Sequence, residues 1–257
     1  YLTFVLFAVV NHLKKDLFST AAKVFIYAVI IYYLIVCGAR TSLMSTLMFV
    51  LFIRFFRISP FLGIITFVAF LGISELLSSN LPAIMTALGL QDYMRVDTLE
   101  DGSGRYFAWQ YAWQQINDQG FFLFGGGFDN EDWVMKQARA YLSSMGHQGG
   151  AHNTYLTLWL NVGIVGLLLY LRSLALIFIK ASKYTPVALA ILFSVLFSIL
   201  YESWLAGSLN PYTIMLLIIL TIVSEDEIML GVEEGREDDY DATEMPVEQS
   251  RLVLPAR

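Results

Sequence analysis

Three ionisable side chains stand beside apolar segments of this sequence and could carry chemistry together: Arg40, Arg105 and His152. Arg40 lies in VCGARTSL, Arg105 in SGRYFAW and His152 in GAHNTYL. A guanidinium group can bind phosphate oxygens with two parallel hydrogen bonds. An imidazole has an ordinary pKa of about 6.5, so it can accept a proton near neutral pH. The residue types therefore predict a site that holds a diphosphate on two arginines while one histidine activates a sugar hydroxyl.

Each of these side chains also has a purely structural explanation. An arginine near a membrane surface can extend to lipid headgroups or pair with a carboxylate, such as those between residues 97 and 101. His152 could serve as a helix cap or an interfacial residue. Glu202 and Asn153 are candidate supporting residues, and Glu202 in LYESWL could orient His152, bind an acceptor sugar or be a simple interfacial carboxylate.

The elements that must position these residues are apolar helices. Of the 257 residues 57% are hydrophobic and 15% charged, and the mean hydropathy is +0.61. Soluble domains are only about 45–50% apolar. Apolar stretches occur at 1–10, 24–37, 41–56, 60–77, 153–171, 186–204 and 211–223. We therefore predict an all-α, polytopic integral membrane protein with six to seven transmembrane helices.

The organisation predicted from this pattern has four parts. Transmembrane helices occupy 1–77, a long extracytoplasmic loop with short helices occupies 78–152, further transmembrane helices occupy 153–223, and an acidic tail occupies 224–257. Residues 225–257 carry eleven acidic and three basic side chains, within a chain whose net charge is −6. Such a composition is typical of a disordered terminus, and an acidic docking tail is the functional alternative.

The basic residues predict which surface carries the candidate site. The connecting segments 11–23, 54–59 and 172–185 each contain lysine or arginine and should be cytoplasmic. The other connections then face outward. This topology places Arg40 and His152 at the outer surface, near the depth of the lipid headgroups, together with Arg105.

The long loop is expected to contain an ordered helix. In GRYFAWQYAWQQIN (104–117) a helical stripe begins at Arg105 and continues four, seven, eight and eleven positions later. These positions are Trp109, Ala112, Trp113 and Ile116. Its tryptophan and tyrosine rings suit a helix that lies at the level of the headgroups. An interfacial helix without any further role is the favoured explanation of these aromatic residues.

Two other motifs in the loop have a weaker chemical meaning. The Gly125-Gly126-Gly127 run lacks the strand and helix of a nucleotide-binding fingerprint, so we expect a turn. Asp129, Glu131 and Asp132 could hold a divalent cation, but a short acidic cluster is more typical of a loop surface. We therefore assign no metal site.

Four segments, in this order and spacing, resemble the bacterial O-antigen ligase/polymerase family of membrane glycosyltransferases. They are Ala39-Arg40 at the end of one span, SGRYFAW (103–109), FGGGF (124–128) and GAHNTYLTLWLNVGIVGLLLYL (150–171). With the topology, the resemblance covers roughly residues 24–223. The sequence starts at Tyr1 within an apolar run, so we expect a fragment that lacks the N-terminal spans of such a protein.

The resemblance implies a transfer of glycan from an undecaprenyl-diphosphate carrier to an acceptor hydroxyl at the periplasmic face of the inner membrane. The acceptor would be lipid A-core or a growing surface polysaccharide, and the inverting reaction would need no metal or cofactor. Arg40 and Arg105 would bind the diphosphate and His152 would be the general base. The implied partners are these substrates and membrane lipids, without nucleic acid.

Two other classes of function are compatible with the composition. A transporter or channel would also be hydrophobic and polytopic, but it tends to carry ionisable or helix-breaking residues near mid-membrane. In this sequence the polar candidates gather at one face instead. A non-catalytic subunit of a polysaccharide assembly system would tolerate the loss of Arg105 and His152.

Overall fold

The computed structural model describes residues 1–14, 16–37, 39–56, 61–62, 65–73, 104–147, 149–183, 185, 187–207 and 210–224. These residues are helical or irregular, and no strand occurs among them, so the predicted all-α class is confirmed for this part of the chain. The acidic tail at 225–257 and the first part of the predicted long loop, 78–103, lie outside the described residues. The helices are α1 (Leu2–Leu13), α2 (Thr20–Val36), α3 (Arg40–Phe56), α5 (Arg105–Asp118), α6 (Asn130–Gln137), α7 (Arg139–Ser144), α8 (Thr154–Ala181), α9 (Val187–Tyr201) and α10 (Pro211–Ser224), with a 3₁₀ turn η4 at Trp204–Ala206.

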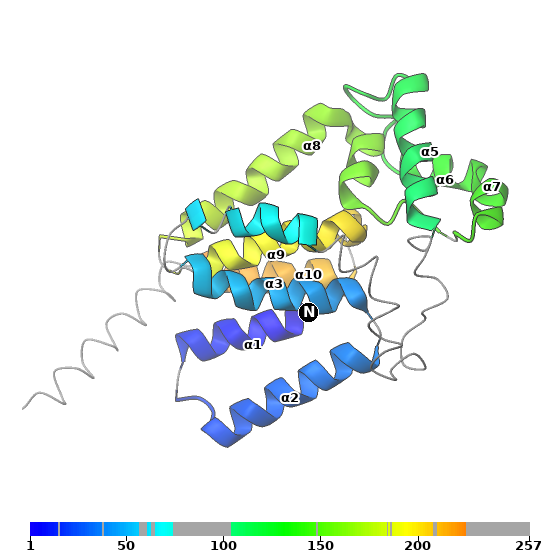
Figure 1. The fold of residues 1–257 in the computed structure, drawn as a ribbon. Coiled ribbons are helices and arrows are strands. Elements are labelled where there is room, and N and C mark those ends of the chain that lie inside the picture. Colours follow the sequence, from blue (N-terminus) through cyan, green and yellow to red (C-terminus); the bar gives the residue numbers. More distant parts are fainter. Residues whose placement is uncertain are drawn as a thin grey trace, which may run out of the picture.

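The larger hydrophobic core lies among the helices that form the bundle in Figure 1. Helix α3 packs along α9, α9 packs on α8, and α1 packs on α10. Aromatic rings fill the space between these helices, as where Phe52 of α3 stacks on Phe193 of α9 with ring centroids 5.6 Å apart. Helix α2 has no buried residue.

Helix lengths limit how many membrane spans the structure supports. Among the residues that the structure describes, only α8, with 28 residues, is long and apolar enough to cross a membrane. Five other apolar helices have 10–17 residues, or about 15–26 Å at a rise of ~1.5 Å per residue, against a hydrocarbon core of ~30 Å. The six to seven spans expected from the sequence are therefore not confirmed, although the apolar helices occur where the apolar stretches predicted them.

Helix α8 is broken at Gly163, which has φ 69° and ψ −178°. The two amides that follow Gly163 donate to the carbonyl oxygens of Phe122 and Leu123, at 2.9 and 3.3 Å. Figure 1 shows the resulting change of direction in α8. The apolar stretch expected at 153–171 is consequently not one straight span. Its first part packs with the outer helices, and residues 164–181 form the long arm beside the bundle.

The glycine run at 125–127 docks against this break. The amides of Gly126 and Gly127 donate to the carbonyl oxygens of Leu160 and Asn161, at 2.8 and 2.9 Å. These are carbonyls of the helical turn that the break leaves open. A Cβ atom on Gly125 would lie 2.5 Å from the Asn161 carbonyl carbon, so only glycine permits this approach. The run predicted as a turn thus provides hydrogen-bond donors for the carbonyl oxygens that the break in α8 leaves open.

We expect Gly163→Ala to lower the free energy of unfolding by more than about 1–3 kcal/mol, the usual cost of a residue forced into a strained backbone region. A Cβ atom there would also lie 2.1 Å from the Leu123 carbonyl oxygen. Gly72→Ala is the matched control, because Gly72 lies in the helical segment 65–73 and a Cβ atom on it would meet nothing within 4 Å. Thermal unfolding in detergent measures both. Equal midpoints for the two variants would contradict a structural role for the break.

A second core joins α5, α6 and α7 to the first part of α8. The buried face of α5 consists of Ala108, Ala112 and Ile116. Trp113, which the predicted stripe included, is 46% exposed and packs edge-on against Trp159. Figure 1 shows α5 transverse to the bundle helices, beside the first part of α8 and at the end of the bundle where α9 terminates.

Candidate active site

Glu202 lies where three elements of the fold meet. It follows the last residue of α9 and precedes η4. Its carbonyl oxygen accepts hydrogen bonds from the amide and the hydroxyl of Thr154, at 3.2 and 2.7 Å, so the start of α8 is tied to the end of α9. The Glu202 side chain is only 17% exposed. The two hydrogen bonds to the Glu202 backbone therefore fix the point from which its carboxylate extends.

Arg105, the first residue of α5, binds this carboxylate. Its Nη2 group donates to Glu202 Oε1 at 3.0 Å, and its Nη1 group donates to the Tyr201 carbonyl oxygen at 2.7 Å. A guanidinium has five N–H donors, so these two bonds leave others for an anion. Gly104 before it has φ 69° and lies against His147, which fixes the start of α5. Arg105 is therefore a partly buried, oriented cation at a helix N-terminus, where the helix dipole favours negative charge.

His152 faces the other oxygen of the same carboxylate. Its Nδ1 atom lies 3.7 Å from Glu202 Oε2, and its side chain is about one third exposed. The backbone of His152 has φ 46°, a left-handed conformation that is uncommon for residues other than glycine. The buried ring of His147 stands edge-on to the His152 ring, with centroids 5.6 Å apart. The imidazole is thus presented from a constrained loop rather than from a helix.

The residue before His152 is clamped by two outer helices. The amide of Ala151 donates to Glu131 Oε1 at 2.7 Å, and its carbonyl oxygen accepts from the indole N–H of Trp109 at 2.8 Å. Sequence reasoning missed both contacts, because it interpreted Glu131 as loop surface and Trp109 as an interfacial ring. The available signal was the spacing of Trp109 four residues after Arg105, which places both side chains on one face of α5.

The remaining predicted site residues have different positions. Asn153 caps α8, since its Oδ1 atom accepts from the Leu156 amide at 3.1 Å, and its side chain is buried. Arg40 begins α3, but its side chain lies outside the described part of the structure. Figure 1 shows that α3 begins and α9 ends at the same end of the bundle, the end that carries α5. Arg40 therefore lies at this end of the bundle, and no contact of its side chain is assigned.

Two of the three acidic residues after the glycine run have protein partners. Glu131 holds Ala151, and Asp132 pairs with Lys136 one helical turn later. Within the described ranges, no three His, Cys, Asp or Glu side chains form a group that could hold a metal ion. Glu131 is accordingly a structural residue of the site rather than part of a solvated cluster.

Taken together, one carboxylate contacts a cation and an imidazole through different oxygens. A carboxylate within hydrogen-bond distance of Nδ1 favours the imidazole tautomer that carries its proton there, which leaves Nε2 to accept a proton. Glu202 Oε2 lies 3.7 Å from Nδ1, so a small approach of the two side chains would form this hydrogen bond. The guanidinium provides fixed positive charge a short distance away. This arrangement can bind an anionic group and deprotonate a hydroxyl within the same small region.

Comparison with known proteins identifies the family of the chain. A family model described as O-antigen ligase matches residues 17–171. The match includes Arg40, Arg105, His152 and the glycine run, while Glu202 lies beyond its end. No curated protein and no solved structure matches the chain.

Proposed function

Because the chain belongs to the O-antigen ligase family, a family of membrane ligases and polymerases of the glycosyltransferase type, we propose the following reaction. The protein transfers glycan from an undecaprenyl-diphosphate carrier to an acceptor hydroxyl at the periplasmic face of the bacterial inner membrane. The acceptor is lipid A-core or a growing surface polysaccharide. The observation that supports this reaction best is the contact of Glu202 with both Arg105 and His152.

Arg105 would bind the diphosphate of the carrier. The bond that breaks joins the anomeric carbon of the sugar to a diphosphate oxygen, and its electron pair leaves with the diphosphate. Negative charge therefore grows on that oxygen in the transition state, and a pre-positioned guanidinium stabilises it without reorganisation. Arg40 would supply a second positive charge from the start of α3.

His152 would act as the general base. The acceptor oxygen attacks the anomeric carbon from the face opposite the diphosphate, which inverts the configuration, and its proton passes to Nε2 of His152. The imidazole becomes an imidazolium, whose charge the Glu202 carboxylate stabilises from the Nδ1 side. No metal is required for this balance, since the guanidinium groups neutralise the leaving group.

Glu202 would be a positioning residue that acts through His152. We expect Glu202→Gln to lower kcat by about 10–10²-fold, as for other residues that orient a reactive imidazole, with little change in KM for the carrier glycan. The amide still has an oxygen that can accept from Arg105, but it cannot stabilise an imidazolium. Steady-state transfer assays measure both constants. Recovery of kcat in Glu202→Asp would show that the negative charge of the side chain is required. An unchanged kcat in Glu202→Gln would exclude this role.

The clamp on Ala151 would hold His152 in its strained conformation. We expect Glu131→Ala to lower kcat by up to about 10²-fold, because small displacements of a reacting group have effects of this size. Glu131→Gln is the matched control, since its amide oxygen can still accept from the Ala151 amide. Comparison of kcat for the two variants at saturating carrier glycan tests the contact. Equal losses in both would show that the charge of Glu131 matters and not its hydrogen bond.

The activity itself can be tested with purified protein and undecaprenyl-diphosphate glycan, with and without lipid A-core. Ladders of longer carrier-linked glycan would identify a polymerase, and a single transfer to lipid A-core would identify a ligase. If folded protein released no undecaprenyl diphosphate in either mixture, this result would contradict the proposed function.

A further inference from the structure

The segment that links α5 to α6 exposes an unusual amount of apolar surface. Residues 121–128, FFLFGGGF, contain no charged or polar side chain, and we call them the apolar turn. Phe124 is 74% exposed, Phe128 is 92% exposed and Leu123 is 53% exposed. Contiguous apolar surface of this kind is unfavourable in water and marks a contact with another apolar phase.

This exposure is fixed by the fold. The apolar turn is hydrogen-bonded at both sides to the break in α8, as described above for Leu123 and the glycines. The indole N–H of Trp159 donates to the Phe122 carbonyl oxygen at 2.9 Å, and the two rings lie edge-on at 5.3 Å. Trp113 also packs edge-on against Trp159, with ring centroids 5.2 Å apart. Tryptophan rings with one polar atom are enriched where a membrane meets water.

The apolar turn is continuous with the apolar side of α8. The carbonyl oxygen of Leu123 accepts a hydrogen bond from the amide of Val165. The side chains of Val165, Leu168 and Leu169 are exposed along the arm of α8 that follows the break. This arm belongs to the helix that is long and apolar enough to cross a membrane. We therefore expect its exposed side chains to face lipid, and the apolar turn extends that apolar surface beyond the break.

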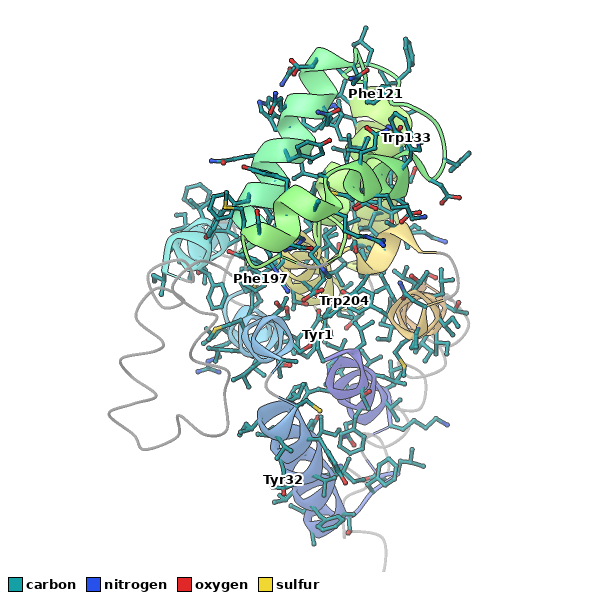
Figure 2. The ribbon with its side chains drawn as sticks, turned by 90° about the vertical axis from the view of Figure 1, so that its right-hand side faces the viewer. Tyr1, Tyr32, Phe121, Trp133, Phe197 and Trp204 are labelled. Carbon is teal, nitrogen blue, oxygen red and sulfur yellow. The ribbon has the colours of Figure 1, made fainter. Side chains whose placement is uncertain are left out.

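The position of the apolar turn fits the outer edge of the membrane. In Figure 1 the bend in α8 and the end of α9 lie at the same end of the bundle, the end at which α5 stands transverse to the bundle helices. Figure 2 views the molecule nearly along α1 and α3, and it shows Phe121 and Trp133 on the flank, well away from Phe197 and Tyr1. The segment therefore lies beside the bundle, where lipid would surround it.

We propose that the apolar turn inserts into the outer leaflet at the boundary between headgroups and acyl chains, and that it anchors the outer helices to the bilayer. The anchor and Arg105 lie at opposite ends of α5. Insertion at one end would hold α5 along the membrane surface and keep Arg105 at the depth of a lipid-linked diphosphate. The anchor depends on the membrane location of the family and not on the transfer reaction.

A fluorescence experiment on the full chain in phosphatidylethanolamine–phosphatidylglycerol nanodiscs tests this proposal. Cys37 is the only cysteine of the sequence, so a Cys37→Ser background accepts single reporters. Leu123→Cys and Phe124→Cys would each carry an environment-sensitive fluorophore. Leu169→Cys on α8 is the lipid-exposed reference, and Ser143→Cys, exposed on α7, is the aqueous reference.

The expected result is that emission from both apolar-turn reporters is shifted to the blue of emission from Ser143→Cys. Lipids with a nitroxide near the headgroup should quench them about as strongly as Leu169→Cys, and a water-soluble quencher should reach them less than Ser143→Cys. Emission and quenching equal to Ser143→Cys, in protein whose thermal midpoint is unchanged, would overturn the proposal. That outcome includes the case of a surface that docks a protein, because such a surface stays in water when only lipid is present.

Discussion

His152→Asn should lower kcat for glycan transfer by about 10²–10⁴-fold, the usual contribution of a positioned general base. Asparagine is the appropriate replacement because it tolerates the left-handed backbone that His152 adopts at φ 46°. His152→Ala would confuse loss of the base with backbone strain. Binding of carrier glycan should persist in His152→Asn, since Arg105 is unchanged. Single-turnover transfer and equilibrium binding, measured on the same preparation, separate the two effects.

His147→Asn is the matched control for His152→Asn. His147 lies in the same loop region, and its Nε2 atom is 2.8 Å from the Gly150 carbonyl oxygen, but its side chain is buried. We expect this substitution to lower the thermal midpoint and to reduce kcat much less than His152→Asn. If the two variants lost kcat equally and both remained folded, His152 would not be distinguished as the base.

The second large effect is expected from Arg105→Lys, with a loss of about 10²–10³-fold in kcat/KM, the range found when one stabilising donor is removed from a developing anion. Lysine keeps a positive charge beside Glu202, which is mostly buried, and so avoids leaving an unpaired carboxylate. It cannot hold the Tyr201 carbonyl oxygen, Glu202 and a diphosphate with one planar group. The loss should appear as weaker binding of carrier glycan together with a lower kcat.

Arg139→Lys on α7 is the control for this substitution, because Arg139 is an exposed arginine of the same outer helices. Its kcat/KM should equal that of the unsubstituted protein. Carrier binding measured by thermal shift, alongside kcat/KM from initial rates, tests both variants. Unchanged binding and turnover in Arg105→Lys would mean that the diphosphate is held elsewhere.

Sequence reasoning anticipated much of the fold because long apolar stretches and a helical stripe are local signals. It placed helices where apolar residues recur, and it selected Arg105, His152 and Glu202 from residue type and predicted membrane side. It did not anticipate the break in α8. Gly163 in LNVGIVG hardly disturbs the apolar pattern, and the break depends on hydrogen bonds between α8 and residues 122–127.

The clamp around His152 also escaped sequence reasoning, for a related reason. Glu131 and Trp109 act on the backbone of Ala151, twenty and forty-two residues away in the chain. Both side chains bind backbone atoms, which carry no charge and follow no sequence pattern, so the sequence alone could not reveal these contacts. Asn153 shows the opposite case, since its position before an apolar helix is a recognisable N-cap signal.

The central claim is that one carboxylate unites a diphosphate-binding cation and a general base, and a double substitution tests it most directly. Single-turnover transfer rates should be compared for His152→Asn, Glu202→Gln and the variant that carries both. If Glu202 acts through His152, the double variant should be no slower than His152→Asn alone. Losses that multiply in the double variant would show that the two residues act independently and would contradict the shared site.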